Sequence, residues 1–109
     1  IGCWSGPSDT YAKVPSKVGS NMNLSVDGER LWDSLMTMAK IGATTKGGVC
    51  RLALTDLDRQ ARDLFISWCR SVGCSITIDQ FGNIFARREG RDSSKPPVIT
   101  GSHLDSQPT

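Results

Sequence analysis

The chain has 109 residues and a formal net charge of +2, with 38% hydrophobic and 22% charged residues. That length suffices for one small domain and is short for an enzyme whose cleft lies between two domains. The chain has no basic stripe interleaved with aromatic residues, which argues against nucleic-acid binding. No apolar run approaches the roughly 20 residues that span a bilayer, and residues 1–20 lack the apolar centre of a signal peptide.

The four cysteines indicate a reduced protein. They lie at Cys3, Cys50, Cys69 and Cys74, none in a Cys-x-x-Cys pair, and the only histidine is far from them in sequence. This spacing argues against a structural zinc knuckle. We expect buried, reduced thiols, as in a cytoplasmic protein, and no disulfide framework.

The first residues differ from the remainder in their patterning. Residues 1–23 combine turn-forming residues with no usable periodicity, and helical patterning begins after Met22. We expect residues 1–23 to be a flexible leader or an upstream segment, and Met22 to be the natural start. Residues 24–109 then form a single structural unit.

A first helix is predicted from about Asp27 to about Lys40, because Asp27 is a favourable N-cap. Its apolar residues recur at helical spacing: Leu31, Leu35 and Met38, widened by Trp32, Met36 and Ala39. Gly42 is a suitable helix stop. Residues 41–54 then form a long, irregular connection, which either carries function or wraps the domain.

A second helix follows the sequence Thr55-Asp56-Leu57-Asp58, which resembles a capping box, and it ends before Gly73. Its apolar face predicts a core contact: Leu57, Ala61, Leu64, Phe65 and Trp68. Its charged residues predict a solvated face: Arg59, Arg62, Asp63 and Arg70.

Strand patterns occupy the last third of the chain. Ile76 and Ile78 alternate with polar residues, residues 80–83 have turn chemistry, and residues 84–88 return as a second strand, which predicts a hairpin. A polar loop over residues 90–97 leads to the apolar run 98–100, which suits an interior strand.

The only histidine, His103, directly follows that predicted interior strand. Ligand-binding groups of open α/β sheets collect at the carboxyl ends of strands. On a continuing strand, Asp105 would point to the same side as His103; after a sharp turn, its carboxylate could contact the imidazole and aim the other ring nitrogen at a metal. By itself, His-x-Asp more often marks a surface histidine than a ligand. A serine nucleophile at Ser102 or Ser106 lacks a nucleophile elbow.

Residues 101–109, Gly-Ser-His-Leu-Asp-Ser-Gln-Pro-Thr, resemble the first metal motif of the di-metal, exopeptidase-like amidohydrolases. The branch with L-carbamoylases, β-ureidopropionase and allantoate amidohydrolase is the most similar. Three further stretches resemble that branch in the same order: residues 41–49, residues 51–55 and residues 79–84. The resemblance extends from Leu24 to Thr109.

The resemblance implies an α/β fold, the N-terminal part of a mixed-sheet, di-zinc exopeptidase-like catalytic domain, with two helices, a hairpin and one further strand. It implies that His103 is a metal ligand and that Asp105 is the catalytic carboxylate orienting it. Two divalent ions, zinc or manganese, would be bridged by a second aspartate and a water, with a glutamate as general base. Those further residues would lie beyond Thr109, so the resemblance implies a truncated domain.

The activity implied is hydrolysis of an N-carbamoyl amino acid or another ureido substrate, a linear amide that is not a peptide. The resemblance implies a cytoplasmic, homodimeric enzyme with a small-molecule substrate and no nucleic-acid or membrane partner. One histidine gives too few ligands for a tight site, so we expect residues 1–109 alone to be inactive and to bind metal weakly.

Two alternatives stay open. One is an aminoacylase or peptidase of the same superfamily, because substrate-reading residues would lie beyond Thr109. The other is a non-catalytic α/β module that binds a partner through Trp32, Phe65 or Trp68, although aromatic residues at helical spacing are more often core.

Overall fold

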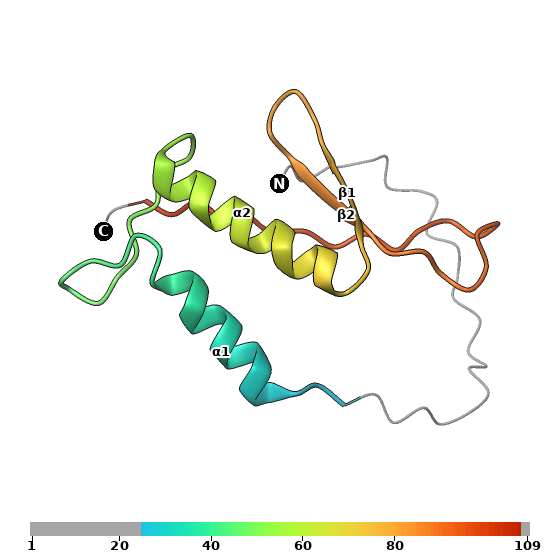
Figure 1. Cartoon of the computed structure of the whole chain (residues 1–109), viewed down its shortest axis with the longest axis horizontal. Helices are drawn as coiled ribbons and strands as arrows, with labels where there is room; N and C mark the ends of the chain where they lie inside the picture. The colour runs from blue at the N-terminus through green and yellow to red at the C-terminus, as the bar shows by residue number, and fades with distance from the viewer. Residues whose placement is uncertain (1–24, 108–109) are drawn as a thin grey trace, which may run out of the picture.

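The computed structural model describes residues 25–107 (Figure 1). The expected leader over residues 1–23, the proposed start at Met22 and Cys3 lie outside the described residues. Four elements follow in chain order: α1 (Gly28–Ala39), α2 (Asp56–Ser71), β1 (Ser75–Ile78) and β2 (Ile84–Arg87). The predicted two helices and hairpin are confirmed. None of the helices in residues 25–107 has the length and apolar character needed to cross a membrane.

Helix α1 begins and ends where the sequence predicts. The Asp27 carboxylate accepts a hydrogen bond of 3.0 Å from the backbone N–H of Arg30, which satisfies one of the free donors of the first turn. After Lys40, the C-cap residue, Gly42 has a φ of +86°, a left-handed conformation that favours glycine.

The apolar face of α1 remains largely exposed. No residue of α1 is buried, and Trp32 is 60% exposed. The expectation that its aromatic residue belongs to a core is therefore wrong for the described residues, because no described element covers this face.

Helix α2 forms the centre of the described structure. Thr55 Oγ1 accepts from the N–H of Asp58 at 3.3 Å, while Asp58 Oδ2 accepts from the N–H of Leu54 at 3.1 Å. The reciprocal bond thus reaches one residue earlier than in a standard capping box. Ala61 is fully buried, and Gly73, with a φ of +81°, follows the helix as predicted.

One charged residue of α2 departs from the predicted solvated face. Arg62 is half-buried, and its Nη2 donates to the carbonyl oxygen of Gly82 in the hairpin turn. The prediction for Arg62 is wrong because the hairpin folds back over this part of α2, a tertiary contact that no local pattern encodes. Arg59 and Asp63 do lie at the surface, with 4.0 Å between their charged atoms.

The hairpin is antiparallel, with Ser75 paired to Arg87 and Ile78 to Ile84, and β1 packs on α2. The Asp79 carboxylate organises its turn by accepting from the backbone N–H groups of Phe81 and Asn83, at 2.9 and 2.8 Å, and from the side-chain amide of Asn83 at 2.8 Å. These bonds, the Asn83 side chain foremost, hold the pKa of Asp79 below its ordinary value.

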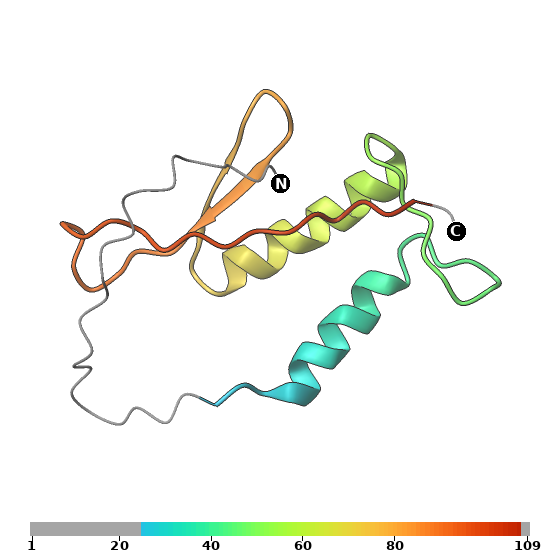
Figure 2. The same cartoon turned by 180° about the vertical axis from the view of Figure 1, so that it is seen from behind.

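The predicted third strand does not form. Residues 98–100 have no strand assignment, and Val98 and Ile99 are 100% and 83% exposed. A strand requires a hydrogen-bonded neighbour, and the sheet of the described residues consists of β1 and β2 alone. In both views, the chain after this run passes along α2 towards the connection between α1 and α2 (Figure 2).

The three described cysteines are free thiols, as expected: Cys50, Cys69 and Cys74, each half-buried. Burial, and secondarily the neighbouring Cys74, raises the pKa of the Cys69 thiol, so that thiol stays protonated at neutral pH. The apolar core is small. Ala61 and Ile84 are its only buried apolar members among residues 25–107.

Candidate metal-ligand site

The histidine-bearing segment is joined to the connection between the helices. The backbone N–H of Ser106 donates to the carbonyl of Arg51 at 2.9 Å, and the N–H of Arg51 donates to Ser106 Oγ at 3.1 Å. Ser106 Oγ in turn donates to the carbonyl of Val49 at 2.8 Å. Residues more than fifty positions apart therefore form one short antiparallel bridge.

Asp105 contacts the imidazole of His103 directly. His103 Nδ1 lies 3.1 Å from Asp105 Oδ1 and 2.9 Å from the backbone oxygen of Asp105. Of the two arrangements that the sequence left open, the structure has the one in which the chain turns and the carboxylate meets the ring. The His103 side chain is 70% exposed and that of Asp105 41% exposed, so the pair lies at the surface.

These two contacts determine the tautomer of the neutral ring. A backbone carbonyl oxygen can only accept a hydrogen bond, so Nδ1 must carry the proton and donate it. The lone pair of the neutral ring then resides on Nε2, for which there is no hydrogen-bond partner among residues 25–107. An exposed imidazole with an oriented ring and a free lone pair can act as a metal ligand.

Arg51 is the residue that sequence reasoning missed. Arginine in an irregular connection is mostly exposed, but Arg51 is only 6% exposed. Its Nε and Nη2 donate to the carbonyl of Leu104 at 2.9 and 2.8 Å. Its Nη1 donates to the carbonyls of Met38 at 3.0 Å and Ile41 at 2.7 Å, at the end of α1. The only sequence signal was its place in a stretch that resembles the amidohydrolases.

Gly42 allows Arg51 to reach this position. The N–H of Cys50 donates to the carbonyl of Gly42 at 2.8 Å, which brings residues 50 and 51 against the turn after α1. A Cβ on Gly42 would lie 2.6 Å from the backbone oxygen of Cys50 and 3.3 Å from Arg51 Cβ. The close approach therefore requires glycine.

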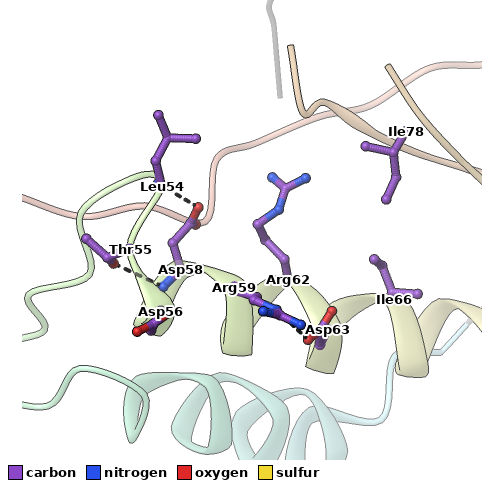
Figure 3. A pocket seen from close by; sticks show the side chains of 9 residues that line it. All are labelled: Leu54, Thr55, Asp56, Asp58, Arg59, Arg62, Asp63, Ile66 and Ile78. Carbon is purple, nitrogen blue, oxygen red and sulfur yellow. Dashed lines mark hydrogen bonds and ion pairs between the residues drawn. The ribbon is translucent and has the colours of Figure 1, made fainter. Parts of the chain in front are cut away.

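Two open cavities of about 250 Å³ each lie beside α2. The one in Figure 3 follows the N-terminal half of α2, where Asp58 faces the Leu54 loop and Arg59 lies beside Asp63, and it does not include His103 or Asp105. The other is lined by Asp105 and Leu104 together with Arg62 and turn residues of the hairpin. The second cavity therefore adjoins the histidine-bearing segment, although His103 itself does not line it.

His103 and Asp105 fit part of a metal site. The pair supplies one nitrogen donor and a carboxylate that orients it, which is the chemistry of a divalent-cation ligand. Among residues 25–107, however, no group of three or more His, Cys, Asp or Glu side chains could hold a metal ion. Residues 25–107 thus offer one imidazole donor, whereas a tight site needs three or four ligands.

No family profile matches the chain. Curated relatives include an N-carbamoyl-L-amino-acid amidohydrolase of Rhizobium meliloti, 52% identical over 87 residues, and one of Geobacillus stearothermophilus, 42% identical over 81 residues. These matches cover 80% and 74% of this chain, but only 21% and 20% of the relatives. The chain therefore spans about a fifth of the length of the curated relatives it matches.

The solved structures that match the chain are likewise amidases or amidohydrolases, matched over about a fifth of their length. A hydantoinase/carbamoylase family amidase of Burkholderia vietnamiensis matches with a TM-score of 0.73 and 66% identity, over 76% of this chain and 20% of that chain. A putative amidohydrolase/peptidase of Burkholderia cenocepacia matches with a TM-score of 0.74 and 67% identity, over 77% of this chain and 20% of that chain.

The fold and the sequence of the chain are similar to the corresponding fifth of amidohydrolases of α/β class. More narrowly, its curated relatives are N-carbamoyl-L-amino-acid amidohydrolases and its structural neighbours are hydantoinase/carbamoylase family amidases, the group that the chain resembles over Leu24 to Thr109.

Proposed function

We propose that this chain carries one metal ligand, His103, of an enzyme that hydrolyses the carbamoyl group of N-carbamoyl-L-amino acids. The observation that carries the proposal is the contact of His103 Nδ1 with Asp105, because it leaves Nε2 available to a cation. The 52% identity to a named N-carbamoyl-L-amino-acid amidohydrolase supports the substrate class.

The chemistry of the substrate supports a metal-dependent reaction. A ureido carbon is a weak electrophile and neutral water a weak nucleophile, and a bound divalent ion lowers the pKa of water towards about 7. Asp105 would keep the His103 ring in one orientation, with its lone pair on Nε2. Hydrolysis would release ammonia, carbon dioxide and the free amino acid.

The proposal includes two divalent ions in the complete site, either zinc or manganese. Imidazole is a suitable ligand for zinc, and carboxylates are suitable ligands for manganese. A cytoplasmic location accords with the three free thiols. The homodimer follows from the family resemblance alone and is proposed on that basis.

The proposal can be tested in a chimera, in which residues 25–107 replace the matching fifth of the Burkholderia vietnamiensis amidase, which is 66% identical there. The substrate class is tested separately on the full-length enzyme, in which N-carbamoyl, N-formyl and N-acetyl amino acids are compared as substrates; this separates a carbamoylase from an aminoacylase. We expect fastest hydrolysis of the N-carbamoyl substrates, and loss of both activity and bound metal in His103→Ala.

The control variant is Lys95→Ala, because the Lys95 side chain is 77% exposed and its ion pair with Asp92 is long, at 4.0 Å. It should keep activity and metal. A His103→Ala chimera that retains its full metal content and turnover would refute the proposal. Preference for N-acetyl substrates would refute the substrate class only.

A further inference from the structure

We propose that Arg51 is a positioning residue for the metal ligand. Its guanidinium holds the Leu104–Asp105 peptide, next to His103, against the end of α1. This inference rests on the proposed role of His103 and adds a residue that acts through the histidine, without touching metal or substrate. The observation behind it is that all four hydrogen bonds of the Arg51 side chain go to backbone carbonyls, two of them to Leu104.

Within residues 25–107, the Arg51 guanidinium has no carboxylate to neutralise it. Arg51 is 6% exposed and forms no ion pair among the described residues. A buried charge without a counter-ion is unfavourable unless hydrogen bonds replace its hydration. The carbonyls of Met38 and Ile41 lie at the C-terminal end of α1, where the helix dipole is negative. The Leu104 carbonyl accepts the remaining two hydrogen bonds of the guanidinium and so also replaces part of its hydration.

The position of the Leu104 carbonyl determines where Asp105 lies, because the two are joined by one planar peptide. On the other side of Asp105, the backbone of Arg51 exchanges hydrogen bonds with Ser106. The same residue therefore holds the main chain before and after Asp105. Both acceptors of the His103 Nδ1 proton, the Asp105 carboxylate and the Asp105 carbonyl, lie within that held segment.

Lysine cannot reproduce these contacts. The planar guanidinium directs Nε and Nη2 at one carbonyl while Nη1 reaches two others, whereas an ammonium group is a point donor on a flexible stem. If the geometry matters more than the charge, Arg51→Lys should behave like Arg51→Met.

The test compares Arg51→Met, Arg51→Lys and Thr55→Ala in the chimera and in the 109-residue chain. Thr55→Ala removes the N-cap bond of α2, so it lowers stability without contacting residues 103–106. In the chimera, release of metal to a chelator and the separate kcat and KM values are measured. In the metal-free 109-residue chain, the ring nitrogens of His103, its only histidine, report the tautomer by NMR.

We expect both Arg51 variants to weaken metal retention by about 10- to 100-fold, the range typical of residues that orient a ligand, and to lower kcat more than they raise KM. In the metal-free chain, both should turn the single tautomer into a mixture. In the chimera, Thr55→Ala should stay within about twofold of the parent in metal release. The inference would be overturned if Thr55→Ala and Arg51→Met changed metal release equally, or if Arg51→Met left metal release unchanged.

The two proposals fail in distinguishable ways. A parent chimera without metal or activity contradicts the proposed function, while the NMR comparison still decides whether Arg51 positions His103. A parent chimera that is active, with an Arg51→Met variant whose tautomer and metal release are unchanged, contradicts only the role of Arg51.

Discussion

Replacing Gly42 by alanine tests how closely the connection between the helices approaches the turn after α1. Gly42 and Gly47 both have left-handed backbones, with φ of +86° and +83°. An alanine in that conformation costs about 1–2 kcal/mol, and this cost applies equally at both positions. The two sites differ in their surroundings: a Cβ at Gly42 would lie 2.6 Å from the Cys50 oxygen, whereas a Cβ at Gly47 meets nothing within 4 Å.

The backbone of Cys50 cannot withdraw without loss, because its N–H donates to the Gly42 carbonyl at 2.8 Å. Overpacking of this kind costs about 1–3 kcal/mol. Gly42→Ala should therefore open the segment more readily than Gly47→Ala, by about 5- to 150-fold in amide exchange. The effect of alanine on the unfolded chain is common to both variants and cancels.

The assay is hydrogen exchange of the Cys50 and Ser106 amides in the chimera. Exchange of both amides is expected to be faster in Gly42→Ala than in Gly47→Ala, because Ser106 is bonded to Arg51 next to Cys50. Equal exchange in the two variants would show that the close approach at Gly42 does not hold this connection.

Asp105→Asn should weaken metal retention of the chimera by about 10- to 100-fold. The asparagine amide can donate to Nδ1 and so favour the tautomer with the proton on Nε2. Metal retention equal to that of the parent chimera would contradict this prediction. Asn83→Ala should raise the pKa of Asp79 towards its ordinary value of 3.8, because the Asn83 amide is the largest cause of its lowering. The folded-state pKa of Asp79 is depressed, so its contribution to stability is present above about pH 3.8 and is lost as the pH falls through that lowered value. Carboxyl NMR titration checks this, and an unchanged Asp79 midpoint in Asn83→Ala would refute it. The 109-residue chain alone should show no submicromolar zinc or manganese binding by calorimetry, because residues 25–107 present no cluster of three metal-binding side chains; tight stoichiometric uptake would contradict it.

Features set by neighbouring residues could be predicted from the sequence. The caps at Asp27 and Thr55 depend on a side chain and an N–H three residues later, and both formed. The hairpin follows from alternating residues around the turn at Asp79. The His103–Asp105 contact was one of two arrangements open to residues two positions apart, and the choice between them needed the structure.

Features set by distant contacts could not be predicted. Arg51 is buried by carbonyls 10, 13 and 53 residues away, and a loop arginine gives no local sign of this. Arg62 is covered by a hairpin whose turn lies 20 residues further along. The run 98–100 has the composition of an interior strand, but a strand depends on a partner, which residues 25–107 do not supply.

The most direct test of the central claim is the tautomer of His103, measured by long-range ¹H–¹⁵N NMR on the metal-free chain at a pH where the ring is neutral. Because the chain has a single histidine, the signal needs no assignment. We predict a proton on Nδ1 and a lone pair on Nε2, with Nε2 perturbed first when zinc is added. A proton on Nε2, or zinc binding through Nδ1, would contradict the orientation of the ring by Asp105.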